Sequence, residues 1–270
     1  MLMITGATGA LGSLITARVA DRDDVVIGSR NPAPGGRRVD FDDPASLDFT
    51  GVDTLLVISA GAAEDDVVVA RHEAVISAAE KAGVGHLVYT SLSGDGDHLT
   101  YALAHRWTER RLRGSSLHWT VLRNGLYAEF LAAVAAPGPD GTIAAPLGAG
   151  RLAAVVREDL AEVAVRVATD PAAHRGRTYE LVGEHALGGA DLAAAVGGSY
   201  EPGTLAATRE ALTAAGQALP FQVPMLMSTY SAIAGGFLDG TGVEDRGALR
   251  TLLGRAPRPA IEAYTAAVRG

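Results

Sequence analysis

The chain has 270 residues, of which 48% are hydrophobic and 20% are charged, so it can bury a sizeable core and has the composition of a globular protein. The absence of cysteine from the sequence excludes disulfides, thiolate nucleophiles and cysteine-ligated metals. The formal net charge of −8 argues against nucleic acid as a partner, because phosphate contacts need a basic surface. No apolar run approaches the roughly 18 residues of a membrane span. The glycine-rich loop begins at Gly6, leaving no room for a signal peptide, and we therefore expect a cytoplasmic protein that does not contact membranes.

Apolar runs and helical patterns alternate through the first 125 residues. The predicted strands cover residues 1–5, 25–28, 37–41, 54–59, 86–90 and 118–122. The predicted helices between them cover residues 11–20, 67–82 and 101–113, with a short one at 44–47. This alternation predicts right-handed crossovers and a doubly wound parallel sheet, the Rossmann type of α/β fold.

The pattern changes in the second half of the chain. A further helix is predicted at 157–169 and a short strand at 178–182, and from Asp191 onward the sequence is mainly helical with Gly and Pro interruptions. We expect a dinucleotide-binding domain over residues 1–125, with returning elements near 151–183. A smaller, mainly helical substrate lobe is expected over 126–150 and 184–270, above the carboxyl ends of the strands, where open sheets bind ligands.

A glycine-rich turn follows the first predicted strand directly. A sharp turn from strand to helix leaves backbone N–H groups unpaired at the helix N-terminus, and glycines let a pyrophosphate approach them. The spacing is G-x-x-G-x-x-G rather than the standard G-x-G-x-x-G. The residues predicted to bind the pyrophosphate of a dinucleotide are Gly6, Thr8, Gly9, Ala10, Leu11 and Gly12.

The end of the second predicted strand indicates which dinucleotide is bound. An NAD site usually has an acidic side chain there, whereas this strand ends in Ser29-Arg30-Asn31. An arginine in that place can pair with a 2′-phosphate, so the sequence predicts NADPH.

Other strand ends are expected to border the cofactor as well. After the third strand, Asp40 and Phe41 can contact the adenine; alternatively, Asp42 or Asp43 caps the helix that begins at Pro44. The ends of the fourth and fifth strands contribute Ser59, Ala60, Thr90 and Ser91.

With these residues assembled, the chain resembles the NmrA-like group of atypical short-chain dehydrogenase/reductases, most closely the bacterial type-two NADPH:quinone oxidoreductases. The resemblance implies NADPH binding, a two-lobed monomer or homodimer, and reduction of quinones or other conjugated carbonyl compounds. The matching segments, in order, are Ile4-Thr-Gly-Ala-Thr-Gly9, Ser29-Arg-Asn-Pro32, Leu55-Leu-Val-Ile-Ser59, His72 with Ile76-Ser-Ala-Ala79, Tyr89-Thr-Ser-Leu92, His105-Arg-Trp-Thr-Glu109, Leu122-Arg-Asn-Gly-Leu-Tyr127, Gly235-Gly-Phe-Leu-Asp239 and Leu252-Leu-Gly-Arg255.

Carbonyl reducers of this superfamily ordinarily use a serine after the fifth strand and a Tyr-x-x-x-Lys pair, in which lysine lowers the pKa of the tyrosine that donates the proton. This chain has Ser91 and Tyr101, but position 105 is His, and the only lysine is Lys81, before the fifth strand. The usual lysine-assisted mechanism is therefore excluded. His105 can hold the nicotinamide ribose or relay a proton. Alternatively, Tyr101 is a packing residue and His105 is a hydrogen-bonded group behind the site.

A quinone makes the missing lysine less important, because hydride addition gives a phenolate that can take its proton from water. Asn124, placed just past the sixth strand, can bind the substrate oxygen or the nicotinamide carboxamide, or else forms a turn with Gly125. The sequence predicts no metal, since Asp95-Gly-Asp97-His98 is typical of a polar turn. The favoured function is NADPH-dependent reduction of a quinone or related aromatic carbonyl. The alternatives are a ketoreductase for a polycyclic aromatic natural product and a non-catalytic NADP-binding redox sensor.

Overall fold

The computed structural model describes residues 1–60, 63–216 and 218–270. Within it the chain forms two compact units. Unit 1 consists of Met1–Leu92, Leu103–Asn124 and Glu158–Tyr179, and unit 2 of Ser93–Ala102, Gly125–Arg157 and Glu180–Gly270. The sequence analysis placed residues 93–102 in the dinucleotide-binding domain, whereas in the structure they group with unit 2.

A seven-stranded sheet is built mainly from unit 1. Its strands are β1 (Leu2–Ile4), β2 (Val25–Ser29), β3 (Arg37–Arg38), β4 (Thr54–Val57), β5 (His86–Leu92), β6 (His118–Asn124) and β9 (Arg177–Leu181). They are arranged in the order β3-β2-β1-β4-β5-β6-β9, and each neighbouring pair from β3 to β6 is parallel. The order reverses direction between β1 and β4, which confirms the predicted doubly wound Rossmann fold.

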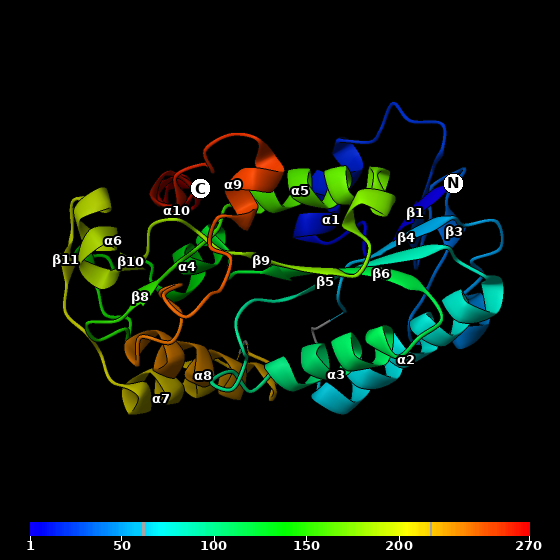
Figure 1. The fold of residues 1–270 in the computed structure, drawn as a ribbon. Coiled ribbons are helices and arrows are strands. Elements are labelled where there is room, and N and C mark those ends of the chain that lie inside the picture. Colours follow the sequence, from blue (N-terminus) through cyan, green and yellow to red (C-terminus); the bar gives the residue numbers. More distant parts are fainter. Residues whose placement is uncertain (61–62, 217) are drawn as a thin grey trace. The chain divides into compact units, whose positions relative to one another are not determined.

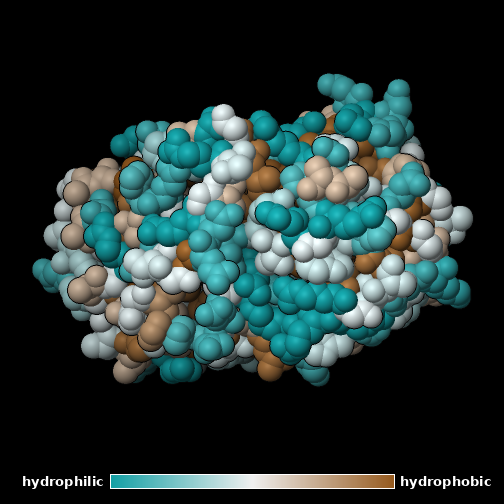
Figure 2. Space-filling view, in the orientation of Figure 1, coloured by the Kyte–Doolittle hydropathy of each residue, from teal (hydrophilic) through white to brown (hydrophobic). Residues whose placement is uncertain are grey.

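Helices cover both faces of this sheet. Figure 1 shows α1 (Ala10–Ala17) and α5 (Arg157–Thr169) on one face, and α2 (Asp65–Ala82) and α3 (Ala102–Arg113) on the other. Two short 3₁₀ helices, η1 (Pro44–Ser46) and η2 (Pro171–His174), lie in the connections. The segment of α3 carries four arginines, and its outer surface is predominantly hydrophilic in Figure 2.

Several predicted boundaries differ from those in the structure. β3 ends at Arg38 instead of continuing to Phe41, because the N–H of Asp40 bonds to the Ser46 hydroxyl at 2.9 Å and its carboxylate accepts from the N–H of Asp42. β5 and β6 run two residues further than predicted, pairing Ser91 with Arg123 and Leu92 with Asn124. Ser91 and Asn124 are therefore strand residues and do not follow the strands, and α3 begins one residue after Tyr101.

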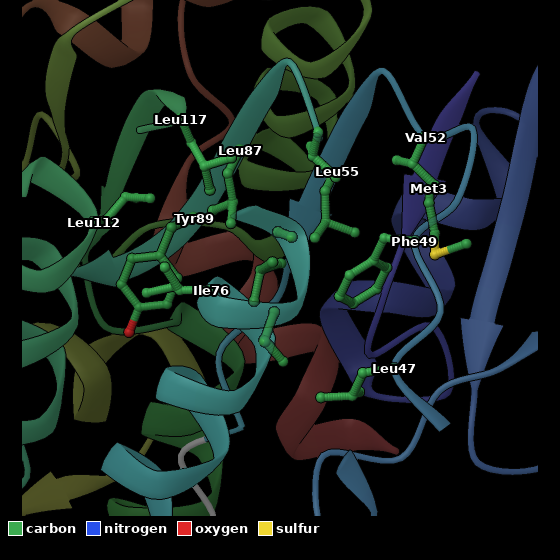
Figure 3. Packing of buried hydrophobic residues seen from close by; sticks show 14 of the residues in the cluster. Met3, Leu47, Phe49, Val52, Leu55, Ile76, Leu87, Tyr89, Leu112 and Leu117 are labelled. Atoms are coloured by element: carbon green, nitrogen blue, oxygen red, sulfur yellow. The ribbon is translucent and has the colours of Figure 1, made fainter. Parts of the chain in front are cut away.

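One hydrophobic cluster of unit 1 packs between the sheet and the helices α2 and α3. Figure 3 shows Met3, Leu55 and Leu87 of the strands together with Ile76 of α2 and Leu112 of α3. Each of these five side chains is at most 2% exposed. Burial of such side chains supplies the main favourable free energy of folding, and it fixes the strands whose carboxyl ends carry the predicted site.

Unit 2 is mainly helical. Its helices are α4 (Ala128–Val134), α6 (Gly189–Val196), α7 (Leu205–Ala215), α8 (Gln222–Ala234), α9 (Ala248–Leu253) and α10 (Ala260–Arg269). Two small sheets accompany them, one pairing β8 (Arg151–Leu152) with β10 (Leu187–Gly188) and the other pairing β7 (Thr142–Ile143) with β11 (Ser199–Tyr200). Leu131, Tyr230 and Tyr264 belong to its separate core. Among the helices of the described residues, none combines the length and apolarity needed to span a membrane.

Close packing of α1 against the preceding turn depends on Gly12. A Cβ atom at this position would lie 2.1 Å from the backbone oxygen of Gly6 and 2.8 Å from Cα of Ala7. Both obstructing atoms belong to the backbone, so no side-chain rotation relieves the overlap. Gly12 therefore allows the helix to begin directly at the edge of the sheet.

We expect Gly12→Ala to lower the free energy of unfolding by about 2 kcal/mol or more, because α1 must move away from the turn. Gly9→Ala is the matched control: its Cβ would meet only the Gly6 oxygen at 3.4 Å, an ordinary contact. Urea denaturation of both variants measures the difference. Equal stability of the two variants would contradict this role of Gly12.

Candidate cofactor and substrate site

The three glycines of the turn between β1 and α1 have different surroundings. Gly6 adopts φ +69°, a conformation that side chains disfavour, and a Cβ there would lie 3.0 Å from Cβ of Ile58. Gly12 is closed in by backbone, as described above. Gly9 precedes α1 in an extended conformation, and among the described residues a Cβ there would meet only the Gly6 oxygen, at 3.4 Å.

The start of α1 fits an anionic group. Thr8, Gly9 and Ala10 are exposed, whereas Leu11 is buried and anchors the helix in the core. The first turn of α1 contains no acidic residue, and no side chain caps the helix at Gly9. The first N–H groups of a helix lack partners within it, so these amides can donate to a pyrophosphate.

Arg30 directly follows β2 and is exposed. Arg30 interacts electrostatically with Asp42. The Asp42 carboxylate accepts hydrogen bonds from Arg71 Nε at 2.6 Å and Nη2 at 2.7 Å. Hydrogen bonding to Arg71 lowers the pKa of Asp42, and the charges of Arg71 and Arg30 lower it further. None of the hydrogen bonds or ion pairs found among the described residues engages the exposed guanidinium of Arg30, so its donors can bind a phosphate.

The segment after β3 is a compact polar turn. Asp40 accepts the N–H of Asp42 at 3.2 Å, and Phe41 packs partly against the core of unit 1. Asp43 precedes η1 but makes no side-chain cap; its carboxylate instead accepts from Arg38 at 2.6 Å. A hydrogen bond from Arg38 and, to a smaller extent, one from the backbone of Ala45 lower the pKa of Asp43. Contact of Asp40 and Phe41 with adenine stays a prediction.

Hydrogen bonds tie the described start of the loop after β4 to neighbouring elements. The N–H of Ser59 donates to Thr90 Oγ1 at 3.0 Å, and the N–H of Ala60 donates to His72 Nε2 at 3.1 Å. His72 of α2 is 1% exposed. The structure thus brings Ser59, Ala60 and Thr90 together at the carboxyl ends of β4 and β5, with His72 as a support.

Ser91 belongs to a buried ionic cluster centred on Glu109, whose side chain is 1% exposed. The Ser91 hydroxyl donates to Glu109 Oε1 at 2.6 Å. Three arginines also pair with this carboxylate: Arg106 at 2.6 Å, Arg123 at 2.7 Å and Arg113 at 3.1 Å. The hydroxyl proton of Ser91 is therefore engaged inside unit 1, and the geometry favours a structural role over proton donation to a substrate.

The arginines determine the ionisation of Glu109. Burial by itself raises the pKa of this carboxyl group, but hydrogen bonds from Arg123 and Ser91 and the charges of Arg106 and Arg123 outweigh burial and lower the pKa to about 2. Arg106 also donates to the backbone oxygen of Leu92 at 2.8 Å. The cluster thus fixes the carboxyl ends of β5 and β6, next to Thr90 and Asn124.

Asn124 ends β6 and is 5% exposed. Its Oδ1 atom is buried and has no hydrogen-bond partner in the described chain. The turn with Gly125 that the sequence left open is not formed, since the N–H of Gly125 donates to the Leu181 oxygen at 2.8 Å. A buried amide oxygen without a partner at a strand end can accept a hydrogen bond from a donor group of a ligand.

Tyr101 lies in unit 2 and bonds to α8. Its hydroxyl is 3.0 Å from Thr229 Oγ1, and Thr229 donates its own proton to the Met225 oxygen at 2.9 Å. Tyr101 is therefore the donor in this bond. Burial raises the pKa of Tyr101, and the bond to Thr229 opposes that shift without reversing it.

His105 is 9% exposed on α3, and its Nδ1 lies 2.8 Å from the hydroxyl of Tyr89. Burial lowers the pKa of His105 to about 4; Arg106 adds to the shift and Glu109 opposes it. The imidazole is thus neutral near pH 7. Its bond to Tyr89 matches the alternative of a hydrogen-bonded group, and a role for Nε2 toward a ligand stays a prediction.

Three functional supports were missed by the sequence analysis: His72, Tyr89 and Glu109. Each occurs in a segment that carries the family resemblance. These residues are polar, yet they stand at strand and helix positions that pack inward. Buried polar groups need hydrogen-bond partners, so such positions could have indicated a buried polar network.

Comparison with known proteins bears on what this arrangement does. Residues 6–171 match the model of a family described as NAD(P)H-binding. The chain belongs to this NAD(P)H-binding family. The resemblance to NmrA-like quinone oxidoreductases is confirmed by a relative from Escherichia coli, "Quinone oxidoreductase 2", which is 37% identical over 202 residues that cover 69% of this chain and 70% of the relative.

A solved structure and a second relative agree with this assignment. A crystal structure of an NADPH-dependent quinone oxidoreductase from Escherichia coli in complex with NADPH superposes with a TM-score of 0.86, at 32% identity, covering 98% of this chain and 99% of that one. An "NAD(P)H azoreductase" from Xenophilus azovorans is 28% identical over 258 residues, 87% of each chain.

We expect the Glu109 cluster to make stability depend on pH. The folded pKa of about 2 lies below the ordinary value of 4.5, so the contribution is full above that value and is lost as the pH falls toward 2. Glu109→Gln removes the buried carboxylate that three arginines share and should cost roughly 3 kcal/mol near neutral pH. Urea denaturation as a function of pH measures both effects.

Glu73→Gln is the matched control, because Glu73 pairs with Arg111 while its side chain is 40% exposed. An exposed pair contributes at most about 1 kcal/mol. Similar losses of stability in the two variants would contradict the account of the buried cluster.

We expect Arg30→Ala to weaken NADPH binding by roughly 1.5–3 kcal/mol and to leave NADH binding nearly unchanged, since only NADPH has the 2′-phosphate. Calorimetry with both nucleotides measures this. Arg38→Ala is the control, because Arg38 already pairs with Asp43. Equal affinities of the unaltered protein for NADH and NADPH would refute the role of Arg30.

Proposed function

We propose that this protein transfers a hydride from NADPH to a quinone or a related aromatic acceptor. The family assignment supports a nicotinamide cofactor, and the relatives named for quinone and azo reduction support an aromatic acceptor. The observation that carries the choice of acceptor is the hydrogen bond from Tyr101 to Thr229.

That bond argues against a reaction that needs a strong proton donor. The Tyr101 proton is engaged by Thr229, and burial raises the pKa of Tyr101 rather than lowering it. Position 105, where this superfamily ordinarily has lysine, holds a histidine whose pKa burial lowers to about 4. Neither group is an activated acid at neutral pH.

A quinone does not need such an acid. When bound, NADPH supplies a hydride, which reduces the quinone to a hydroquinone anion that takes its proton from water. The residues of the protein then contribute mainly by binding and orientation, which can account for much of the rate.

Individual residues are assigned to these tasks as follows. The amides that begin α1, at Ala10 and Leu11, bind the pyrophosphate, and Arg30 binds the 2′-phosphate. Ser59, Ala60 and Thr90 border the cofactor, and Gly9 leaves room for its approach. The orphaned Oδ1 of Asn124 accepts from the N–H of the nicotinamide carboxamide, or Nδ2 of the same side chain donates to the substrate oxygen.

The test follows the disappearance of reduced nicotinamide with a panel of a naphthoquinone, an azo compound and an aryl ketone. We expect turnover of the naphthoquinone, and little change on Tyr101→Phe, because the phenol supplies no proton. Asn124→Ala should lower kcat/KM about tenfold, the effect of losing one buried hydrogen bond.

Two results would contradict the proposal. One is tight NADPH binding without turnover of any acceptor, which indicates a sensor. The other is preferential reduction of the aryl ketone with a loss of about 10²–10⁴ in kcat on Tyr101→Phe, which indicates a general acid and hence a ketoreductase.

A further inference from the structure

Tyr89 and His105 share a hydrogen bond inside unit 1. Tyr89 is 1% exposed, and its hydroxyl oxygen lies 2.8 Å from His105 Nδ1. Figure 3 shows the Tyr89 ring beside Ile76, with its hydroxyl oxygen pointing away from Leu87 and Leu117. The bond therefore joins β5 to α3 through a polar contact at the edge of the apolar core.

A second histidine lies against the same tyrosine and has a defined arrangement of hydrogens. His72 Nε2 accepts the N–H of Ala60, so a neutral His72 carries its hydrogen on Nδ1, which donates to Thr108 Oγ1 at 2.8 Å. Thr108 in turn donates to the Ala104 oxygen at 2.7 Å. The ring of His72 meets Tyr89 edge-on, with 5.4 Å between centroids.

The phenol proton of Tyr89 then decides which nitrogen of His105 carries hydrogen. Burial raises the pKa of Tyr89, so the phenol stays protonated, and burial keeps His105 neutral. A neutral imidazole has one N–H. The Tyr89 hydroxyl has two hydrogen-bond partners, His105 Nδ1 at 2.8 Å and the side chain of Thr108. When the phenol donates to Nδ1, the hydrogen of His105 is on Nε2.

We propose that Tyr89 is a positioning residue that holds His105 in its neutral Nε2–H form, so that His105 donates a hydrogen bond to an oxygen atom of the bound cofactor or substrate. The oxygen is a ribose hydroxyl or a carbonyl oxygen. This inference rests on the proposed function for its ligand. In this arrangement His105 donates a hydrogen bond without transferring a proton. A proton relay would require His105 to accept a proton as well.

The charged and titratable neighbours of His105 are consistent with a fixed neutral ring. Arg106 disfavours its protonation, Glu109 favours it, and His72 is itself neutral because burial lowers its pKa to about 3. The attraction of Glu109 for a proton on His105 is outweighed by burial and by Arg106, which together lower the pKa of His105 to about 4.

Nitrogen-15 NMR of the histidine rings tests the arrangement of hydrogens without any acceptor substrate. The His105 signals are assigned by their loss in His105→Ala. We expect a protonated-type Nε2 and an unprotonated Nδ1 in the unaltered protein, and a mixture of both tautomers in Tyr89→Phe. An Nδ1–H form in the unaltered protein would overturn the proposal.

A kinetic double-mutant cycle tests the consequence. Tyr89→Phe should lower kcat/KM about tenfold, as loss of the Nε2 donor does, and should have no further effect in a His105→Ala background. A change in NADPH affinity assigns the donor to the cofactor, whereas a change in KM or kcat for the acceptor alone assigns it to the substrate. Equal effects of Tyr89→Phe in both backgrounds would show a merely structural role and refute the proposal.

Tyr179→Phe is the matched control, because Tyr179 also bonds to a histidine Nδ1, that of His174, at 2.8 Å. It should leave the His105 signals and NADPH affinity unchanged. Failure of the proposed function can be distinguished from failure of this inference. A protein that reduces no acceptor but still shows the Tyr89-dependent tautomer of His105 would contradict the proposed reaction and support the positioning of His105.

Discussion

The buried carboxylate of Glu109 is the interaction on which the organisation of the candidate site most depends. It lies between the ends of β5 and β6 and binds Ser91 of one strand and Arg123 of the other. A carboxylate that is 1% exposed can remain charged only because arginines surround it. The register that sets Thr90 and Asn124 at the carboxyl edge is thus fixed by charge as well as by the sheet hydrogen bonds.

A second constraint acts at the other side of the point where the strand order reverses. In the turn between β1 and α1, small residues stand where the backbone of α1 approaches the turn. The first amides of α1 are thereby left available to a ligand. Gly12 makes the approach possible, and Gly9 leaves space for a ligand. The two glycines illustrate that one motif can combine a requirement of folding with a requirement of binding.

The sequence predicted the fold well because its signals are local and periodic. Apolar runs, glycine turns and amphipathic helices located nearly every element of unit 1, and the turn before α1 was predicted in full. The extent of β3 was missed because Ser46 and the Asp40 carboxylate compete for backbone groups that a strand would use. Such a competition depends on a contact six residues away and has no periodic signature.

The chemistry of individual side chains was less predictable than their location. Ser91, Tyr101 and His105 were expected near the reaction, but their hydrogen-bond partners are Glu109, Thr229 and Tyr89, which come from elsewhere in the chain. Sequence spacing shows that two residues can share a helix face. It does not show which buried carboxylate or hydroxyl takes the remaining hydrogen bond.

We expect NADPH to bind at the carboxyl edge of the unit 1 sheet, against the turn before α1. Hydrogen exchange of the backbone amides with and without NADPH tests it most directly. We predict slower exchange on NADPH addition for amides at 8–12, 30–31 and 59–60, with no change in the η2 segment (Pro171–His174). Unchanged exchange at residues 8–12 in a protein saturated with NADPH would contradict the account.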